Sequence, residues 1–160
     1  MTQFTQRARS ITLRTVKQVA LAGVLLASAV AVIAQTNTPV GTWQTIDDHT
    51  GQPKALVQIT EDGSGQLSGK VIKGLAANGQ PNRCTACTDE RKDRPILGMT
   101  IISGMKKDGD GWDQGQILDP ENGKVYKCKM HLEDDGNKLV VRGYIGVALL
   151  GRSQTWVRQQ

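Results

Sequence analysis

From residue 42 to the end of the chain, apolar and polar residues alternate with a period of two, in short runs. No stretch there repeats its apolar residues with the 3.6-residue period of a helix. Such alternation is typical of strands with one buried and one solvated face. We predict eight β-strands, which span residues 42–46, 55–60, 66–73, 99–106, 112–119, 124–133, 138–145 and 153–158.

Most of the connections between these runs are short and rich in Gly, Asp and Asn. The tightest are residues 61–65, 107–111, 119–123 and 134–137. Gly and Asn supply the positive φ that tight hairpins need, and Pro120 presets the first angle of its turn. Short connections predict antiparallel neighbours in sequence order, and closing such a meander removes both exposed edges. We therefore predict an all-β fold, an eight-stranded antiparallel up-and-down barrel, with a two-sheet sandwich as the alternative.

The alternation also assigns the two faces of the strands. In the run 124–133 the predicted inward residues are Tyr126, Cys128, Met130 and Leu132, and the outward ones are Lys127, Lys129 and His131. The same rule turns inward Ala55, Val57 and Ile59 in the second run, and Leu139, Val141 and Ile145 in the seventh. A barrel of this size holds either packed side chains or one small ligand.

The two ends of the barrel domain carry residues suited to closing it. The first run contains Trp43, whose indole needs burial, and the last run ends on Arg158. We expect the Arg158 guanidinium to lie over the Trp43 ring where the first and last strands meet. Such a contact contributes about 0.5–2 kcal/mol.

Residues 1–34 have the pattern of a secretory signal peptide. A basic segment that ends at Lys17 precedes an apolar stretch, residues 19–30, and small residues follow it. We expect cleavage after Ala34, or alternatively after Ala31. An uncleaved membrane anchor is the alternative, but the apolar stretch is short for a span of about 20 residues. Residues 35–160 should then form one domain that is periplasmic or secreted and has no stable membrane insertion after cleavage.

The charge of the chain changes once the leader is set aside. The whole chain has 20 Lys and Arg against 15 Asp and Glu, and four of the basic residues lie in the leader. The remaining residues are close to neutral. Nucleic acid therefore loses its main support as a partner.

The one long connection, residues 74–94, contains Cys84 and Cys87. In an exported protein such a pair usually forms a disulfide, and we expect a structural staple worth about 1–2 kcal/mol, since its ring is small. A redox-active dithiol and a metal site are the alternatives. Zinc would need Cys128 with His131 or His49, but Cys128 and His131 point to opposite faces of one strand.

No catalytic constellation stands out. Both His49 and His131 are expected at the surface, and paired Asp residues lie in turns where Asp has a conformational role. Residues 108–113 resemble part of a calcium loop but lack its distal Glu. We predict a protein without catalytic residues, bound metal or cofactor.

A ligand in the barrel would contact inward aromatic and sulfur-containing side chains. The candidates are Trp112, Tyr126 and Met130. Arg142 and Tyr144 are predicted to face outward, opposite the inward residues of their strand. If that assignment is inverted, Arg142 would be a cation inside the barrel, suited to a carboxylate head group, and Tyr144 would lie beside it.

Several short segments resemble one family in order and spacing. They are residues 41–43, 50–51, 67–71, 84–87, 95–98, 115–120, 123–126, 139–144 and 156–158. On these segments the chain resembles domain of unknown function 2147, a secreted bacterial family. The resemblance implies a lipocalin-like (calycin) barrel, but no established reaction or ligand.

Three hypotheses of function follow. The first is an exported, non-enzymatic barrel that binds a small apolar or amphipathic ligand. The second is an envelope structural or interaction protein whose barrel is filled by its own side chains. The third is a redox factor that uses Cys84 and Cys87.

Overall fold

The structure, a computed structural model, describes residues 37–75 and 82–160, so the predicted leader lies outside the described residues. Every described residue belongs to one compact unit, Ala34–Gln160. Eight strands form this unit: β1 (Gly41–Ile46), β2 (Pro53–Glu61), β3 (Leu67–Gly74), β4 (Thr100–Asp108), β5 (Gly111–Asp119), β6 (Lys124–Glu133), β7 (Lys138–Tyr144) and β8 (Arg152–Gln159). Two single-turn 3₁₀ helices, η1 (Asp134–Gly136) and η2 (Ala148–Leu150), lie beside β7. Within this part of the chain no helix has the length and apolar character to cross a membrane.

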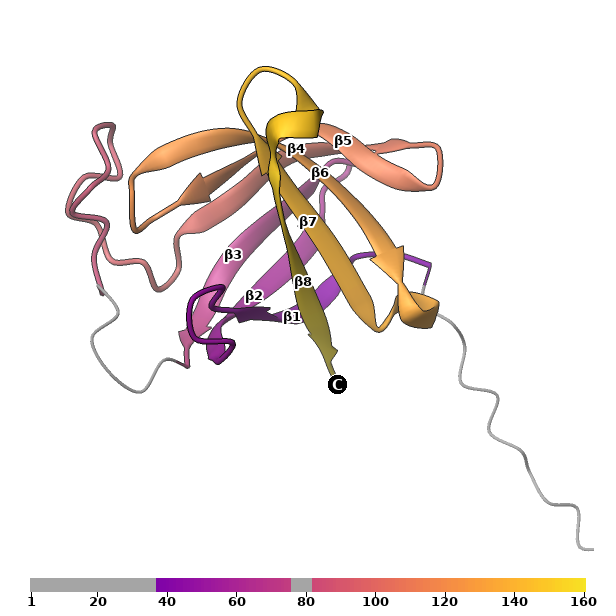
Figure 1. The fold of residues 1–160 in the computed structure, drawn as a ribbon, viewed down its shortest axis with the longest axis horizontal. Helices are drawn as coiled ribbons and strands as arrows, with labels where there is room; N and C mark the ends of the chain where they lie inside the picture. The colour runs from indigo at the N-terminus through magenta and orange to yellow at the C-terminus, as the bar shows by residue number, and fades with distance from the viewer. Residues whose placement is uncertain (1–36, 76–81) are drawn as a thin grey trace, which may run out of the picture. The chain divides into compact units, whose positions relative to one another are not determined.

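The strands form a closed barrel in sequence order (Figure 1). Each strand pairs antiparallel with the next, and β8 returns to pair with β1. The prediction of an eight-stranded up-and-down barrel is confirmed, and each predicted strand end lies within two residues of the observed one. The β4–β5 hairpin illustrates the turn chemistry, because Gly109 adopts φ of 52° between the paired residues Asp108 and Gly111.

The core lies inside the barrel, as the alternation predicts. In β6, Cys128 and Met130 are buried while Lys127, Lys129 and His131 are exposed. Some positions depart from simple alternation, such as the adjacent Ile101 and Ile102 in β4, which are both buried. The ladder between β5 and β6 shifts register between Trp112 and Gly115, so that both of these residues are buried although they are an odd number apart. Ile145, predicted inside the seventh strand, lies just past the end of β7, where it borders the mouth but is 66% exposed and not part of the core.

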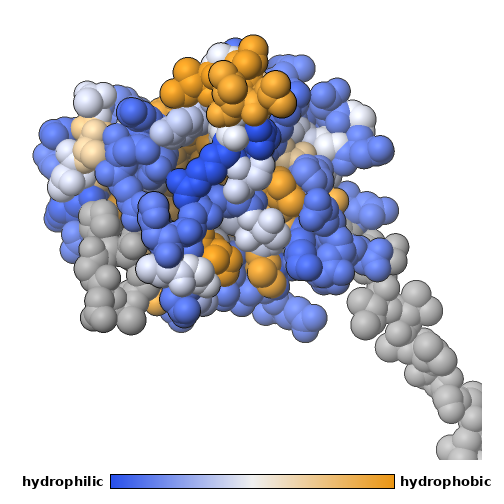
Figure 2. All heavy atoms as spheres, viewed as in Figure 1, coloured by the Kyte–Doolittle hydropathy of each residue, from blue (hydrophilic) through white to orange (hydrophobic). Residues whose placement is uncertain are grey.

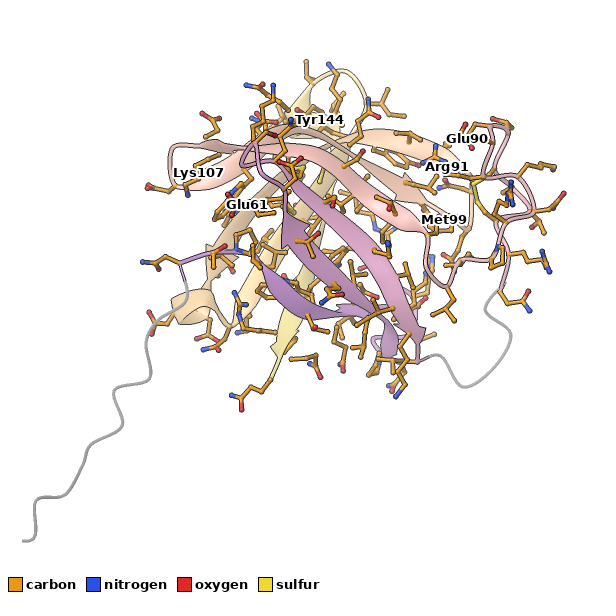
Figure 3. The ribbon with its side chains drawn as sticks, turned by 180° about the vertical axis from the view of Figure 1, so that it is seen from behind. Glu61, Glu90, Arg91, Met99, Lys107 and Tyr144 are labelled. Carbon is orange, nitrogen blue, oxygen red and sulfur yellow. A yellow bond between two sulfur atoms is a disulfide. The ribbon has the colours of Figure 1, made fainter. Side chains whose placement is uncertain are left out.

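Because neighbouring strands run in opposite directions, the connections gather at two ends of the barrel. The end that we call the closed end carries the β2–β3, β4–β5 and β6–β7 turns, and the mouth carries the β1–β2, β3–β4, β5–β6 and β7–β8 connections. Figure 3 shows this separation, with Glu61 and Lys107 on one side and Glu90, Arg91 and Met99 on the other.

The barrel is sealed at the closed end by the first and last strands. Their ladder has three residue pairs, one of which joins Trp43 to Arg158. The Arg158 guanidinium lies 4.2 Å from the centroid of the buried Trp43 ring. It also donates hydrogen bonds to three backbone carbonyl oxygens, of Thr38 at 2.7 Å, Val40 at 3.0 Å and Gly136 at 2.7 Å. The Trp43 indole N–H donates to the Pro39 carbonyl at 2.7 Å, so the polar edge of the ring is satisfied.

Candidate ligand-binding site

A cavity of about 690 Å³ opens at the mouth of the barrel. All eight strands contribute to its wall, together with residues of all four mouth connections. Its volume lies within the range of about 300–1,000 Å³ that is usual for small-molecule sites. The mouth of the barrel is therefore the candidate binding site.

The deep part of the cavity is apolar. We call five of its residues the floor: Val57, Val71, Ile117, Val141 and Trp156. Each comes from a different strand, and period-two alternation turns its side chain inward. The Trp156 indole N–H donates to the side-chain oxygen of Gln154, which also lines the cavity, at 3.2 Å. The floor therefore offers an apolar surface with no unsatisfied donor on its tryptophan.

Charged side chains surround the opening. We call Asp47, Asp48, Lys54, Glu121 and Arg152 the rim. The Lys54 ammonium lies 2.7 Å from the Glu121 carboxylate and 3.6 Å from the Asp47 carboxylate, so it joins β2 and the β1–β2 turn to the β5–β6 turn. Arg152, at the start of β8, pairs with Asp48. The rim thus links segments that are far apart in the sequence, and it presents both charge signs to anything in the opening.

Asp47 organises the β1–β2 turn within this rim. Its carboxylate accepts hydrogen bonds from the backbone N–H of His49 at 3.0 Å and of Thr50 at 2.9 Å, and from the Thr50 hydroxyl at 3.0 Å. The Thr50 N–H is the largest cause that holds the pKa of Asp47 down at about 2. Burial opposes this effect and raises the pKa, while the Thr50 hydroxyl, the His49 N–H and Lys54 lower it further. The carboxylate is therefore charged at any physiological pH.

The β3–β4 connection forms one side of the mouth and contains the predicted disulfide. Cys84 and Cys87 are bonded to each other, and both are buried. Backbone hydrogen bonds from Cys84 N to Arg94 O at 2.9 Å and from Asp93 N to Cys84 O at 3.0 Å fold the segment back on itself. Further along, Ile96 and Leu97 line the cavity. The disulfide therefore supports a wall of the candidate site.

This connection packs directly on the β5–β6 turn. Gly123 has φ of 70°, and a Cβ added there would lie 2.0 Å from the Ala86 carbonyl oxygen. The Cys84 sulfur also lies 3.4 Å from the Pro120 carbonyl oxygen. Both the backbone conformation and the close approach require glycine at position 123. The disulfide loop and the β5–β6 turn thus form one packed unit beside the rim.

Two of the five predicted ligand-contacting residues line the cavity. They are Tyr126, whose hydroxyl accepts a hydrogen bond from the Asn122 side chain at 3.0 Å, and Tyr144, at the end of β7. Trp112 and Met130 do not line it. They pair with each other across β5 and β6 in the packed core. The ammonium of the exposed Lys107 lies 3.9 Å from the Trp112 ring centroid.

Arg142 also lies away from the cavity, on the outer wall. Val141 and Gly143 turn inward on either side of it, so its side chain points outward. This agrees with the prediction that Arg142 faces outward and not with the inverted alternative. Its guanidinium donates to the carbonyl oxygens of Ala148 at 2.7 Å and Leu149 at 3.0 Å, and to the Ser153 hydroxyl at 2.8 Å. Arg142 therefore holds the β7–β8 connection in place.

The third cysteine, Cys128, is a buried thiol of the core. Burial is the main cause that raises its pKa to about 12, and the Asp113 carboxylate adds to the effect. A thiol in that state is a poor nucleophile and a poor metal ligand. Within the described residues, no group of three or more His, Cys, Asp and Glu side chains is placed to hold a metal ion. His49 and His131 are exposed, and His131 contacts Glu133 at 3.1 Å.

A second hollow, of about 490 Å³, lies against the β3–β4 connection and β4. It is wide open to solvent, and Arg91 within it is paired with Asp89. Hydrogen bonds from Arg91 lower the pKa of Asp89 to about 2, which makes this a satisfied surface ion pair. The barrel cavity is the better candidate site because it alone of these two hollows reaches the apolar interior of the barrel.

The sequence of residues 41–158 matches a protein family described as uncharacterized proteins conserved in bacteria (DUF2147). The match covers most of the chain. This chain belongs to that family. No curated protein matches its sequence. Among solved structures, it is similar to protein HP1028 from Helicobacter pylori, which is described as belonging to the lipocalin family. The two share 18% sequence identity and a TM-score of 0.64 over 76% of this chain and 82% of that one.

This likeness shows that the DUF2147 chain has a lipocalin-like fold. Sequence reasoning identified the fold, the family and one aromatic residue of the cavity, Tyr126, whereas Tyr144, which it expected to face outward, also lines the cavity. It did not identify the rim. The rim residues come from two turns and from the ends of β2 and β8, and no signal in the sequence pairs Lys54 with Glu121.

Proposed function

We propose that this DUF2147 protein is an exported, non-enzymatic binding protein that holds one small amphipathic molecule in its barrel. The cavity of about 690 Å³ at the mouth is the observation that carries this proposal. A filled structural barrel, the rival hypothesis, would leave no space of this size.

The division of the cavity into floor and rim supports an amphipathic ligand. An apolar tail would replace water against the floor, which is the main favourable term in binding. A polar head group would remain at the rim, where Lys54 and Arg152 can receive an anionic group and Asp47, Asp48 and Glu121 a cationic one.

The condition of the disulfide argues against a redox function. Thiol–disulfide exchange needs a sulfur that an attacking thiolate can reach. The side chains of Cys84 and Cys87 are 0% and 1% exposed, and the Ala86 carbonyl between them is packed on the β5–β6 turn. A structural role fits these contacts better than a catalytic one.

The proposed location outside the cytoplasm rests on two features. Residues 1–34 have the pattern of a secretory leader. A disulfide between Cys84 and Cys87 persists in oxidising compartments and is rare in the cytosol. Together they favour the periplasm or the medium.

Binding of a fluorescent amphiphile, dansyl-labelled undecanoic acid, tests the proposal. Ala55 is half-buried and lines the cavity, so Ala55→Phe places a ring where the ligand would lie. We expect at least about tenfold weaker probe binding, because the ring displaces apolar contact area. Gln58→Phe, on the same strand but exposed, is the matched control and should bind like the wild type.

Equal probe binding by wild type and Ala55→Phe would contradict the proposal, and so would no binding by either. Native mass spectrometry of protein isolated from the periplasm adds an independent test. An extra mass that organic extraction removes would identify the ligand class. A bare polypeptide mass together with no probe binding would favour a structural barrel.

A further inference from the structure

The β7–β8 connection carries the most exposed apolar side chains of the described residues. We call residues 145–150 the apolar loop. Its exposed members are Ile145 (66%), Val147 (61%), Leu149 (85%) and Leu150 (80%). Figure 2 shows them as a continuous apolar surface that stands above the end of the barrel. Contiguous exposed apolar side chains on a soluble domain usually mark a contact surface.

The conformation of this loop is fixed by the rest of the protein. The 3₁₀ helix η2 closes with hydrogen bonds from Leu150 N to Val147 O at 3.2 Å and from Gly151 N to Ala148 O at 3.0 Å. Arg142 binds the Ala148 and Leu149 carbonyls from below. The aliphatic side chains are therefore carried on a supported turn, in which the carbonyl oxygens of Val147, Ala148 and Leu149 accept hydrogen bonds.

Cations surround the base of the loop. Arg142 contacts it directly, Arg152 follows it in the chain, and Lys127 pairs across the sheet with Tyr144, which precedes it. Lys127 takes part in none of the ion pairs formed by the described residues, and Arg142 contacts only neutral acceptors among them. Arg152 is paired with Asp48, so the cations that remain for an anionic surface are Lys127 and Arg142. An aliphatic tip with these two cations at its base complements an anionic membrane surface, in which acyl chains lie beneath phosphate groups.

We propose that the apolar loop docks this protein on an anionic lipid surface with the mouth of the barrel facing the bilayer. Ile145 and Leu150 also line the cavity, so docking would bring the opening to the lipid. The docking is peripheral and shallow. An exchange of ligand between bilayer and cavity would rest on the proposed function, whereas the docking itself does not.

A second copy of the chain fits this surface less well. Four aliphatic side chains are few beside the 20–30 residues a side of a standard protein interface. The loop is convex and lacks the aromatic residues that usually carry binding energy between proteins. Acyl chains, in contrast, adapt to any aliphatic protrusion.

The test uses the protein as isolated after export, with its start established by intact mass. Leu149→Trp places a reporter at the tip of the loop, while the native tryptophans Trp43, Trp112 and Trp156 are buried, so lipid should leave their emission unchanged and the difference spectrum reports the new residue. With vesicles of phosphatidylethanolamine and phosphatidylglycerol (3:1), we expect its emission to shift to the blue. An unchanged spectrum at saturating lipid would overturn the proposal.

Sedimentation with the same vesicles tests the residues themselves. Val147 and Leu149 do not line the cavity, so Val147→Ser with Leu149→Ser should lower vesicle binding at least about tenfold and leave binding of the fluorescent amphiphile unchanged. Val157→Ser, an exposed aliphatic position near the closed end, is the matched control and should bind vesicles like the wild type. Lys127→Gln should weaken binding about fivefold, and only with the anionic vesicles.

The outcomes separate the possible occupants of the loop. If the Val147→Ser, Leu149→Ser protein binds vesicles as the wild type does, the loop is not the docking element. If the wild type sediments as a dimer that this variant dissociates, a second copy covers the loop and the proposal is wrong. Vesicle binding needs no ligand in the cavity. A protein that binds the fluorescent amphiphile but not vesicles would therefore overturn the docking proposal and leave the proposed function standing.

Discussion

The closed end and the mouth of the barrel are made from the same eight strands but are organised differently. At the closed end, Trp43, Met105, Trp112, Met130 and Leu139 are buried in a packed core. At the mouth, the same inward alternation leads into a cavity, and ion pairs between connections take the place of packed side chains.

The difference shows how a small domain can combine stability with a binding site. Burial of large side chains supplies most of the stability, and it is concentrated where β8 meets β1. The mouth is then free to hold water or a ligand. Changes at the closed end should therefore act on stability, whereas changes at the mouth should act on binding and on local order.

The largest expected effect comes from removing the ring that seals the closed end. Trp43→Ala should lower the free energy of unfolding by about 3–5 kcal/mol, as truncation of a buried aromatic side chain usually does. Urea denaturation measures this loss. Its cause is the lost burial, the lost contact with Arg158 and the unpaired Pro39 carbonyl.

Trp43→Phe is the control for this change, since it keeps a ring beneath Arg158 and removes only the indole hydrogen bond and part of the area. It should cost less than Trp43→Ala and bind the amphiphilic probe as the wild type does. A loss below about 1 kcal/mol for Trp43→Ala would contradict the sealing role of this residue.

A smaller effect on stability is expected from the disulfide at the mouth. Cys84→Ala with Cys87→Ala should cost about 1–2 kcal/mol, because a ring closed over so few residues constrains the unfolded chain only slightly. The variant should also bind the probe more weakly, since the same loop supports Ile96 and Leu97 in the cavity wall. Denaturation and probe titration measure the two effects.

Wild-type protein treated with reductant under mild denaturation, and then returned to native conditions, serves as the comparison. It should reproduce both effects of the double variant. Unchanged probe affinity in the variant, alongside the loss of stability, would show that the disulfide does not shape the site.

The smallest effect concerns the acid dependence of the β1–β2 turn. The pKa of Asp47 is lowered from 3.8 to about 2, so its charged form stabilises the fold above pH 3.8 and this contribution is lost as the pH falls through about 2. Asp47→Asn should therefore be less stable than the wild type at neutral pH. The difference should shrink between pH 4 and pH 2, as measured by urea midpoints.

Asp62 offers a matched position at the closed end. Hydrogen bonds from the Ser64 side chain, and from the backbone of Gln66 and Ser64, lower its pKa as well. Asp62→Asn should change the acid dependence of stability without changing probe affinity, whereas Asp47→Asn should change both. Equal effects of the two variants on probe affinity would remove the distinction between the ends.

The strands could be predicted because each depends on local rules. Alternation and Gly- or Asn-containing turns are written into consecutive residues, and they locate all eight strands and the faces of most side chains. Trp43 and Arg158 could be matched because the chemistry of a ring and a guanidinium is specific, and closure of a barrel brings its ends together.

The candidate site was predicted only in part. Trp112 and Met130 face inward as expected, but the depth of a residue along the barrel axis, which alternation does not report, places them in the packed half. The sequence analysis extended the seventh strand by one residue, to Ile145, and assigned no face to residues 146–150, so it did not predict the exposure of this segment. The hydrogen bond from Arg142 to the Ala148 carbonyl, which supports this loop, depends on the folded position of the loop against β7.

By itself, the sequence determined the class of fold, the order of the strands and the inward or outward direction of their side chains, since these follow from spacing along one chain. The tertiary structure decided where the barrel is filled and where it is hollow, which charges meet across the mouth, and which apolar side chains are left at the surface. These features depend on distances between residues such as Lys54 and Glu121, far apart in the chain, and periodicity carries no information about such distances.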